Sequence, residues 1–184
     1  LNKTHTCLIH AGAGGVGHQL IQLAKEKGAR VLTTTGNTEK AEIAKGFGAD
    51  ETILYRETDF AEAVLDLTDG KGVDAVFDSV GQATIDGSIT STKLLGTVAL
   101  FGDASGVTPT IETRKLAANC IKLTRVALMP FVADHGAIVK RCDDLFRLHQ
   151  EGKLTPMIAP IRPLAEAGAA LTDLAGRNTH GKLL

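Results

Sequence analysis

The residues of this sequence best suited to chemistry form the glycine-rich run Gly12-Ala13-Gly14-Gly15-Val16-Gly17. The run has the spacing G-x-G-x-x-G. It follows an apolar stretch that predicts a buried strand at residues 6–10, and it precedes apolar residues at helical spacing. In that context the first glycine permits a tight turn, the second lets the backbone approach a pyrophosphate, and the third lets the helix pack closely. Amide groups at the start of the helix then bind phosphate. The run therefore predicts a dinucleotide-binding site.

The end of the second predicted strand selects between the two nicotinamide dinucleotides. An acidic residue about 20 positions after the glycines binds the ribose 2′-hydroxyl of NAD. Here that strand ends in Thr33-Thr34-Thr35-Gly36-Asn37, and Lys40 follows in the first turn of the next predicted helix. A carboxylate would repel a 2′-phosphate, whereas a lysine attracts one. The sequence therefore favours NADP(H) over NAD(H); a solvated Lys40 is the alternative interpretation.

Two polar loops follow later strands and are candidates for the nicotinamide side of the site. They are residues 78–81 and 101–106, and ordinary turn chemistry explains either equally well. His10, beside the glycine turn, is interpreted as a structural hydrogen-bonding residue. No side chain is predicted to be an acid–base catalyst. The three cysteines lack a CxxC pair, so they are predicted to be buried free thiols of a reducing cytoplasm without a metal site.

These residues are positioned by alternating strand and helix patterns. Strands are expected at residues 6–10, 30–34, 51–54, 73–77, 96–101 and 121–126, with helices between the first five, the last of these at residues 83–92. This alternation of strands and helices predicts an α/β fold, a Rossmann doubly wound parallel sheet of about six strands with helices on both faces. Residues 1–130 form this dinucleotide-binding core. Residues 131–184 add a long helix at 134–150, a proline-bearing run at 155–164 and a helix at 165–175. The long helix is expected to bury Ile138, Cys142, Leu145 and Phe146.

Composition excludes several classes of protein. The 184 residues carry a formal net charge of −1 and only 4% aromatic residues, which predicts neither nucleic acid binding nor attraction to an anionic membrane. The sequence contains no long apolar run, so a membrane or secreted protein has no support and a cytoplasmic location is expected. The first residue, Leu1, is not methionine, and the chain is expected to be an excised domain.

The glycine run and its neighbours also resemble a known family. His10-Ala11 followed by the run is similar to the HAxAGGVG signature of NADPH:quinone oxidoreductases, which belong with zeta-crystallin to the medium-chain dehydrogenase/reductase superfamily. The similarity continues in register over nearly the whole chain, through segments 35–40, 55–56, 78–81, 101–102, 124–125 and 176–182.

The resemblance implies roles for particular residues. Gly15 and Val16 would form the pyrophosphate turn, and Gly36, Lys40 and Tyr55 the 2′-phosphate and adenosine pocket. The nicotinamide side would be contacted by Val80, Phe101, Gly102, Asp103, Ala104, Ala127 and Leu128, with Arg177 near a cofactor phosphate. Two residues depart from the family pattern: Asp103 replaces an asparagine or serine, and Gly12 an alanine.

The resemblance further implies zinc-independent hydride transfer from NADPH to a small-molecule quinone or enone. A GroES-like catalytic domain, absent from this sequence, would complete the enzyme, so the present chain is expected to be inactive alone. A homodimer would form through the edge strand near Ile121–Val126. The rivals are an NADPH-dependent enoyl or enal reductase, a zinc alcohol dehydrogenase, and a nucleotide-binding module without catalysis.

Overall fold

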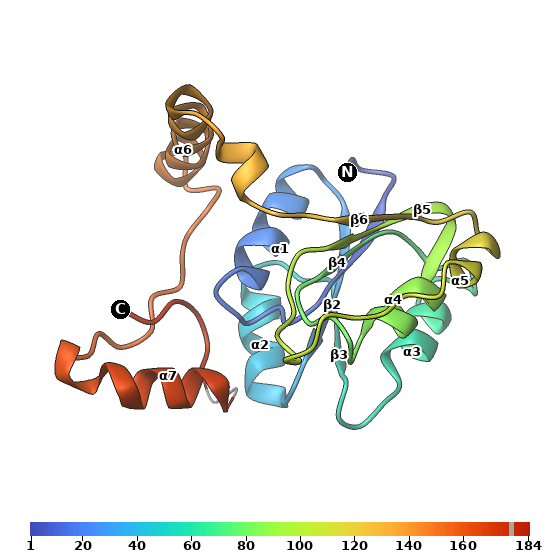
Figure 1. Cartoon of the computed structure of the whole chain (residues 1–184), viewed down its shortest axis with the longest axis horizontal. Coiled ribbons are helices and arrows are strands. Elements are labelled where there is room, and N and C mark those ends of the chain that lie inside the picture. Colours follow the sequence, from blue (N-terminus) through green and yellow to red (C-terminus); the bar gives the residue numbers. More distant parts are fainter. Residues whose placement is uncertain (177–178) are drawn as a thin grey trace.

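The computed structural model describes residues 1–176 and 179–184, and these contain one parallel sheet in the order β3-β2-β1-β4-β5-β6 (Figure 1). The strand order changes direction between β1 and β4, as in doubly wound dinucleotide-binding folds. The predicted α/β doubly wound sheet is therefore confirmed. The six strands are β1 (Thr6–Ile9), β2 (Arg30–Thr35), β3 (Glu51–Leu54), β4 (Val73–Asp78), β5 (Thr92–Leu100) and β6 (Lys122–Arg125).

Helices cover both faces of the sheet, and β1 shows how the sequence fills both cores. Cys7 and Ile9 are fully buried toward α1 (Gly17–Glu26) and α2 (Thr38–Gly46), whereas Leu8 is fully buried toward α3 (Phe60–Asp66) and α4 (Ile85–Thr90). Successive side chains of a strand alternate between its faces, so a strand covered on both sides is continuously apolar.

The helix beginnings differ in a way that bears on the site. At α2 the side chain of Asn37 accepts a hydrogen bond from the Lys40 amide at 2.9 Å, and at α3 Asp59 accepts from the Ala61 amide at 2.8 Å. Both are ordinary side-chain caps. The start of α1, at Val16, has no side-chain cap and no acidic residue in its first turn. The first turn of α1 therefore keeps its amide groups and its positive electrostatic potential available.

The segments after β5 agree less closely with the predictions. β5 begins at Thr92 rather than residue 96, and α4 is shorter than the predicted helix at 83–92. The thiols also differ, since Cys7 is buried but Cys120 is exposed and Cys142 only partly buried. The remaining elements are α5 (Arg114–Ala117), η1 (Met129–Val132), α6 (His135–Gln150), η2 (Leu164–Glu166) and α7 (Ala167–Ala175), of which α5 and η1 were not expected.

The long helix α6 forms where predicted, but its apolar face is not buried. Ile138, Leu145 and Phe146 are 41%, 42% and 61% exposed, and Cys142 is only partly buried. Figure 1 shows α6 standing apart from the sheet, at the upper left. The expectation of burial was wrong because amphipathic spacing reports an apolar face, not the presence of an element to cover it.

The C-terminal segment returns to the core. Leu154 and Ala159 are 4% and 6% exposed, and isolated parallel bridges join Ile158 to Lys182 and Gly14 to Gly181. The segment therefore docks in part on the glycine turn of this same chain.

No helix in residues 1–176 or 179–184 is both long and apolar enough to cross a bilayer.

Candidate dinucleotide-binding site

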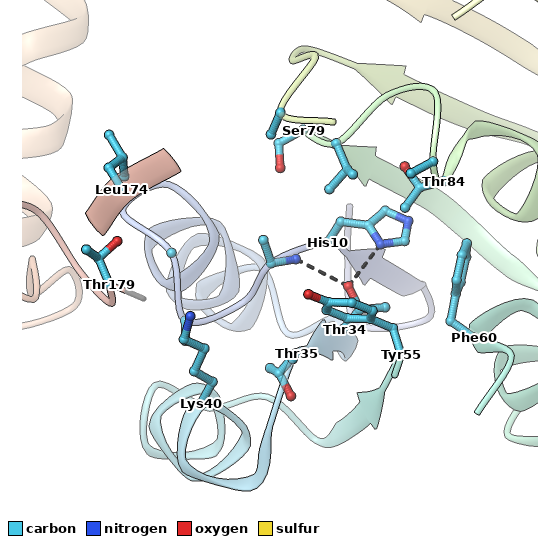
Figure 2. Close-up of a pocket in the computed structure, with 17 residues that line it drawn as sticks. His10, Thr34, Thr35, Lys40, Tyr55, Phe60, Ser79, Thr84, Leu174 and Thr179 are labelled. Atoms are coloured by element: carbon cyan, nitrogen blue, oxygen red, sulfur yellow. Dashed lines mark hydrogen bonds between the residues drawn. The ribbon is translucent and has the colours of Figure 1, made fainter. Parts of the chain in front are cut away.

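A cavity of about 410 Å³ opens where β1, β2 and β4 end (Figure 2). Its walls come from the glycine turn, the end of β2, the loops after β3, β4 and β5, and the C-terminal segment. Ligands of doubly wound folds bind at this edge, where the strand order reverses. Residues that define its boundaries are Gly14, Lys40, Tyr55, Ser79, Leu174 and Thr179.

The glycine turn is built differently from the sequence interpretation. The residue with a left-handed backbone is Ala11, at φ 56°, and none of the four motif glycines has a positive φ. A Cβ at Gly12 would collide with the Thr33 side chain, and one at Gly17 with the Ala11 carbonyl oxygen. Gly12 and Gly17 are thus required for close packing, and Gly14 lines the cavity. The left-handed residue of the turn is thus Ala11, while the first glycine, Gly12, leaves room for the Thr33 side chain.

The turn presents amide groups suited to an anion. The Gly15 amide faces the Gly181 carbonyl across the Gly14–Gly181 bridge, whereas within the described residues no acceptor takes the amide hydrogens of Val16 or Gly17. The first amides of a helix have no partner inside it, and the helix dipole favours negative charge at that end. With no carboxylate in the first turn of α1, the arrangement can accept a phosphate group.

The end of β2 supplies a second polar wall. Gly36, Lys40 and Tyr55 line the cavity together, and a Cβ at Gly36 would stand 3.1 Å from the Tyr55 hydroxyl oxygen. In Figure 2 the Lys40 ammonium points toward the cavity and the wall that carries Thr179. No carboxylate occurs among the described residues that line the cavity. This wall therefore suits an additional anionic group.

Beneath the cavity runs a buried chain of hydrogen bonds. Asp78 and Ser88 are fully buried, and the Ser88 hydroxyl donates to Asp78 Oδ2 at 2.8 Å. His10 Nε2 therefore donates to Ser88 Oγ at 3.0 Å, and His10 Nδ1 accepts from the Thr34 hydroxyl at 3.0 Å. The Thr34 oxygen in turn accepts from the Ala11 amide at 3.3 Å. Every hydrogen bond of this series is thus donated in the direction of the Asp78 carboxylate.

The environment of His10 keeps its imidazole neutral. Complete burial lowers the pKa of His10 from 6.5 to about 4, against the opposing attraction of Asp78. The ring lies edge-on to Phe60, with centroids 4.8 Å apart. A neutral ring can donate at one nitrogen and accept at the other, as this chain of hydrogen bonds requires. The His10 ring thus connects with the glycine turn through Thr34, whose oxygen accepts from the Ala11 amide, which fits its interpretation as a structural hydrogen-bonding residue.

The nicotinamide-side loops meet at one corner of the cavity. The Ala104 amide donates to the Ser79 carbonyl at 3.1 Å, and Val80 and Ala104 both line the cavity. Phe101, Gly102 and Asp103 lie behind this corner, outside the cavity lining. The Asp103 carboxylate pairs with Arg125 at the end of β6, at 2.6 Å.

Several predicted site residues lie elsewhere. Ala127 and Leu128 follow β6 without lining the cavity, and Leu128 is 69% exposed. Arg177 lies outside the described residues. Val16 is 57% exposed at the start of α1, beyond the cavity wall.

Sequence reasoning missed five residues of the cavity wall that lie outside the segments it assigned to the site. Phe60 begins α3, and Ala83 and Thr84 lie in the loop after β4, where such residues have many other uses. Leu174 and Thr179 come from the C-terminal segment, and no periodicity or motif signals their approach.

Comparison with known proteins agrees with this geometry. Residues 15–136 match a family described as zinc-binding dehydrogenase. The 2-haloacrylate reductase of a Burkholderia species is 38% identical over all of this chain and 58% of its own length. A mycobacterial structure complexed with NADPH has a TM-score of 0.94 at 41% identity, and Escherichia coli quinone oxidoreductase complexed with NADPH has 0.93 at 31%. In both comparisons the matched region covers all of this chain and 58% of the chain in the solved structure.

The fold and the cavity define a dinucleotide-binding domain of the doubly wound class. The chain belongs to the zinc-binding dehydrogenase family, and it corresponds to the cofactor-binding part of a medium-chain dehydrogenase/reductase. It spans just over half the length of the relatives it matches.

The family description raises the question of zinc. Zinc sites need three or four clustered histidine, cysteine or carboxylate ligands. No group of three or more such side chains that could hold a metal occurs within residues 1–176 and 179–184. The described residues therefore do not fit a zinc ion.

Proposed function

We propose that this chain holds NADP(H) for the reduction of a quinone or a related conjugated carbonyl compound by hydride transfer. The observation that carries the proposal is the wall of Gly36, Lys40 and Tyr55 beside a turn with available amides, without a lining carboxylate. Two of the similar structures are NADPH complexes, which supports the same cofactor here.

The chain's own residues would divide the binding work. The amides of Val16 and Gly17, in the turn that contains Gly15, bind the pyrophosphate, with Gly12, Gly14 and Gly17 giving the turn its close packing. Lys40 binds the 2′-phosphate as a point charge. Gly36 and Tyr55 contact the adenosine side, and Arg177 is proposed to lie near a phosphate.

The other half of the cofactor would lie toward β4 and β5. Val80, Phe101, Gly102, Asp103 and Ala104 orient the nicotinamide ribose and ring, and Ala127 and Leu128 approach the carboxamide. A bound nicotinamide supplies the hydride, while the protein supplies position and electrostatics. We assign no acid–base role to any side chain of this chain.

A second acceptor class is favoured by one relative. The name 2-haloacrylate reductase denotes action on a conjugated carbon–carbon double bond beside a carboxylate. An enoyl or enal reductase of the same superfamily is therefore the alternative proposal, and a zinc alcohol dehydrogenase is a less favoured one. Parallel turnover assays with a quinone, an enal and a 2-haloacrylate decide between the acceptors.

Calorimetric titration of the chain with NADPH and NADH tests the cofactor proposal. We expect NADPH to bind with a stoichiometry of one and NADH to bind more weakly. Equal affinities, or no binding of either dinucleotide, would contradict the proposal. Turnover with NADPH, measured for this chain and for a longer form carrying a GroES-like domain, tests the alternative of a non-catalytic binding module.

The proposal includes an assembly. Residues 1–130 form the cofactor-binding core, and residues 131–184 connect it with a substrate domain. Among the residues that the structure describes, β6 pairs with β5 alone, so its other edge carries backbone groups that no described strand pairs with. We propose that this edge, near Ile121–Val126, pairs with its copy in a homodimer. The cytoplasmic location expected from the sequence stays a prediction.

A further inference from the structure

A buried histidine on α1 has no part in the roles described so far. His18 is fully buried in the first turn of α1, and its ring lies 4.8 Å from that of Phe47. Its Nδ1 lies 2.7 Å from the carbonyl oxygen of Gly14, and its Nε2 lies 2.9 Å from the amide nitrogen of Met157. An amide can only donate, so Nε2 accepts and Nδ1 carries the proton. One imidazole thus joins the phosphate turn to a segment 139 residues later.

One helical turn further on, Gln22 makes a parallel connection. Its Oε1 accepts from the Thr155 amide at 2.7 Å, and its Nε2 donates to the Thr155 carbonyl at 3.0 Å. Residues four apart share one face of a helix, so His18 and Gln22 together bind residues 155–157 along the length of α1. We call this pair of side chains the latch.

The latched segment is connected to the turn a second time. The Lys182 amide donates to the Met157 carbonyl at 2.8 Å, and the Gly181 amide donates to the Ala13 carbonyl at 3.0 Å. Gly181 has φ 64°, and a Cβ there would stand 2.5 Å from the Met157 carbonyl oxygen. Position 181 therefore packs too closely against Met157 for any residue but glycine.

The chain between these two connections reaches the cavity. Leu174 and Thr179 line it, on the side that Figure 2 shows facing Lys40. The latch therefore fixes the chain before Leu174 directly, through residues 155–157, and the chain after Thr179 indirectly, because Met157 also pairs with Lys182.

We propose that His18 and Gln22 are positioning residues of the dinucleotide site: by latching residues 155–157 onto α1 they hold Leu174 and Thr179 as a wall of the cavity. The inference rests on the proposed binding of NADP(H). Releasing the latch lets the wall move, and the bound dinucleotide then dissociates faster while its association is little affected.

The test compares His18→Leu, which removes both hydrogen bonds, with His18→Gln, whose amide can donate to Gly14 and accept from Met157. Hydrogen exchange without ligand should show faster exchange at the amides of Met157, Gly181 and Lys182 in His18→Leu only. Stopped-flow dissociation of NADPH should be about tenfold faster in His18→Leu, a factor within the range for the loss of two ordinary hydrogen bonds. In His18→Gln it should stay within about twofold of the parent chain.

Controls separate this inference from folding and from the proposed function. Phe47→Leu alters the packing of the ring and keeps its hydrogen bonds, so it should leave the dissociation rate unchanged. If His18→Leu does not fold, the partly buried Gln22→Leu provides the same comparison. Faster exchange with unchanged NADPH dissociation overturns the inference, as does failure of His18→Gln to restore the rate. Failure of the parent chain to bind NADPH contradicts the proposed function instead, while the exchange measurement still tests the latch.

Discussion

Replacing Lys40 with alanine is the sharpest test of the proposed cofactor preference. Lys40 is partly buried in the cavity wall beside Gly36 and Tyr55, and no carboxylate lines that wall within the described residues. A lysine and a phosphate 4 Å apart attract by about 4 kcal/mol at an effective dielectric constant of 20, before desolvation and side-chain ordering are subtracted. Truncations of hydrogen bonds to charged groups leave a net loss of about 1–3 kcal/mol. We therefore expect NADPH binding to weaken about 5- to 150-fold.

NADH supplies the internal comparison because it carries a hydroxyl where NADPH carries the 2′-phosphate. Its affinity for Lys40→Ala should equal that for the parent chain. Lys45→Ala is the matched control, since Lys45 lies on the same helix, is 51% exposed and pairs with Glu42 at 2.9 Å. Isothermal titration at low and high salt gives both affinities, and added salt should reduce the preference for NADPH. An equal loss for both dinucleotides would show that Lys40 does not contact the 2′-phosphate, and the assigned pocket would be wrong.

Three further outcomes follow from the buried groups, the glycines and the sheet edge. The pKa of His10 is about 4 in the folded chain and lies below its ordinary value of 6.5. As the pH falls from 6.5 to about 4, the unfolded chain therefore binds a proton that the folded chain does not. The free energy of unfolding should fall by about 3 kcal/mol over this pH range. Urea titrations should show a flatter pH dependence for His10→Gln, and an unchanged slope would refute the burial argument. Gly17→Ala should destabilise the fold by about 1–3 kcal/mol because the added Cβ would collide with backbone atoms of Ala11. Gly46→Ala should stabilise it by about 0.5–1 kcal/mol, because the space around this residue of α2 is open. Equal unfolding midpoints in denaturant for both variants and the parent chain would contradict both expectations. The Val126 amide donates to Leu100 of β5, so by strand alternation the Arg125 amide points away from β5. Arg125→Pro should therefore shift a homodimer toward monomer in sedimentation experiments, and an unaltered dimer would exclude that edge.

The sequence predicted the sheet and the place of the site well because both depend on local patterns. Apolar runs of four to six residues separated by helical spacing suffice to define a parallel sheet, and a glycine run after the first strand marks its ligand-binding edge. The prediction was weaker on why each glycine is needed. Ala11 adopts the left-handed conformation while Gly12 and Gly17 avoid collisions with Thr33 and Ala11, and such collisions depend on neighbours that a motif does not contain.

The exposed face of α6 marks a second limit of the sequence. Ile138, Leu145 and Phe146 recur at the spacing of a buried stripe, and the helix forms as the pattern predicts. Their exposure shows that periodicity fixes which residues share a face but carries no information about what packs against it. The same holds for Leu128, which follows β6 and is 69% exposed outside the cavity lining.

The two buried histidines are positioned in different ways, one by strand alternation and the other by a contact with a segment far away in the sequence. His10 follows Leu8 by two positions, so strand alternation alone directs it to the face of α3 and α4, where Phe60 and Ser88 meet it. Nothing local directs His18 to Met157, because that partner exists only after the C-terminal segment has folded back onto α1. The face of a buried side chain can thus be inferred from a few neighbouring residues, whereas its hydrogen-bond acceptor or donor cannot. For that reason the glycine motif locates the phosphate turn, yet the residues that hold the far wall of the cavity come from a segment in which no motif occurs.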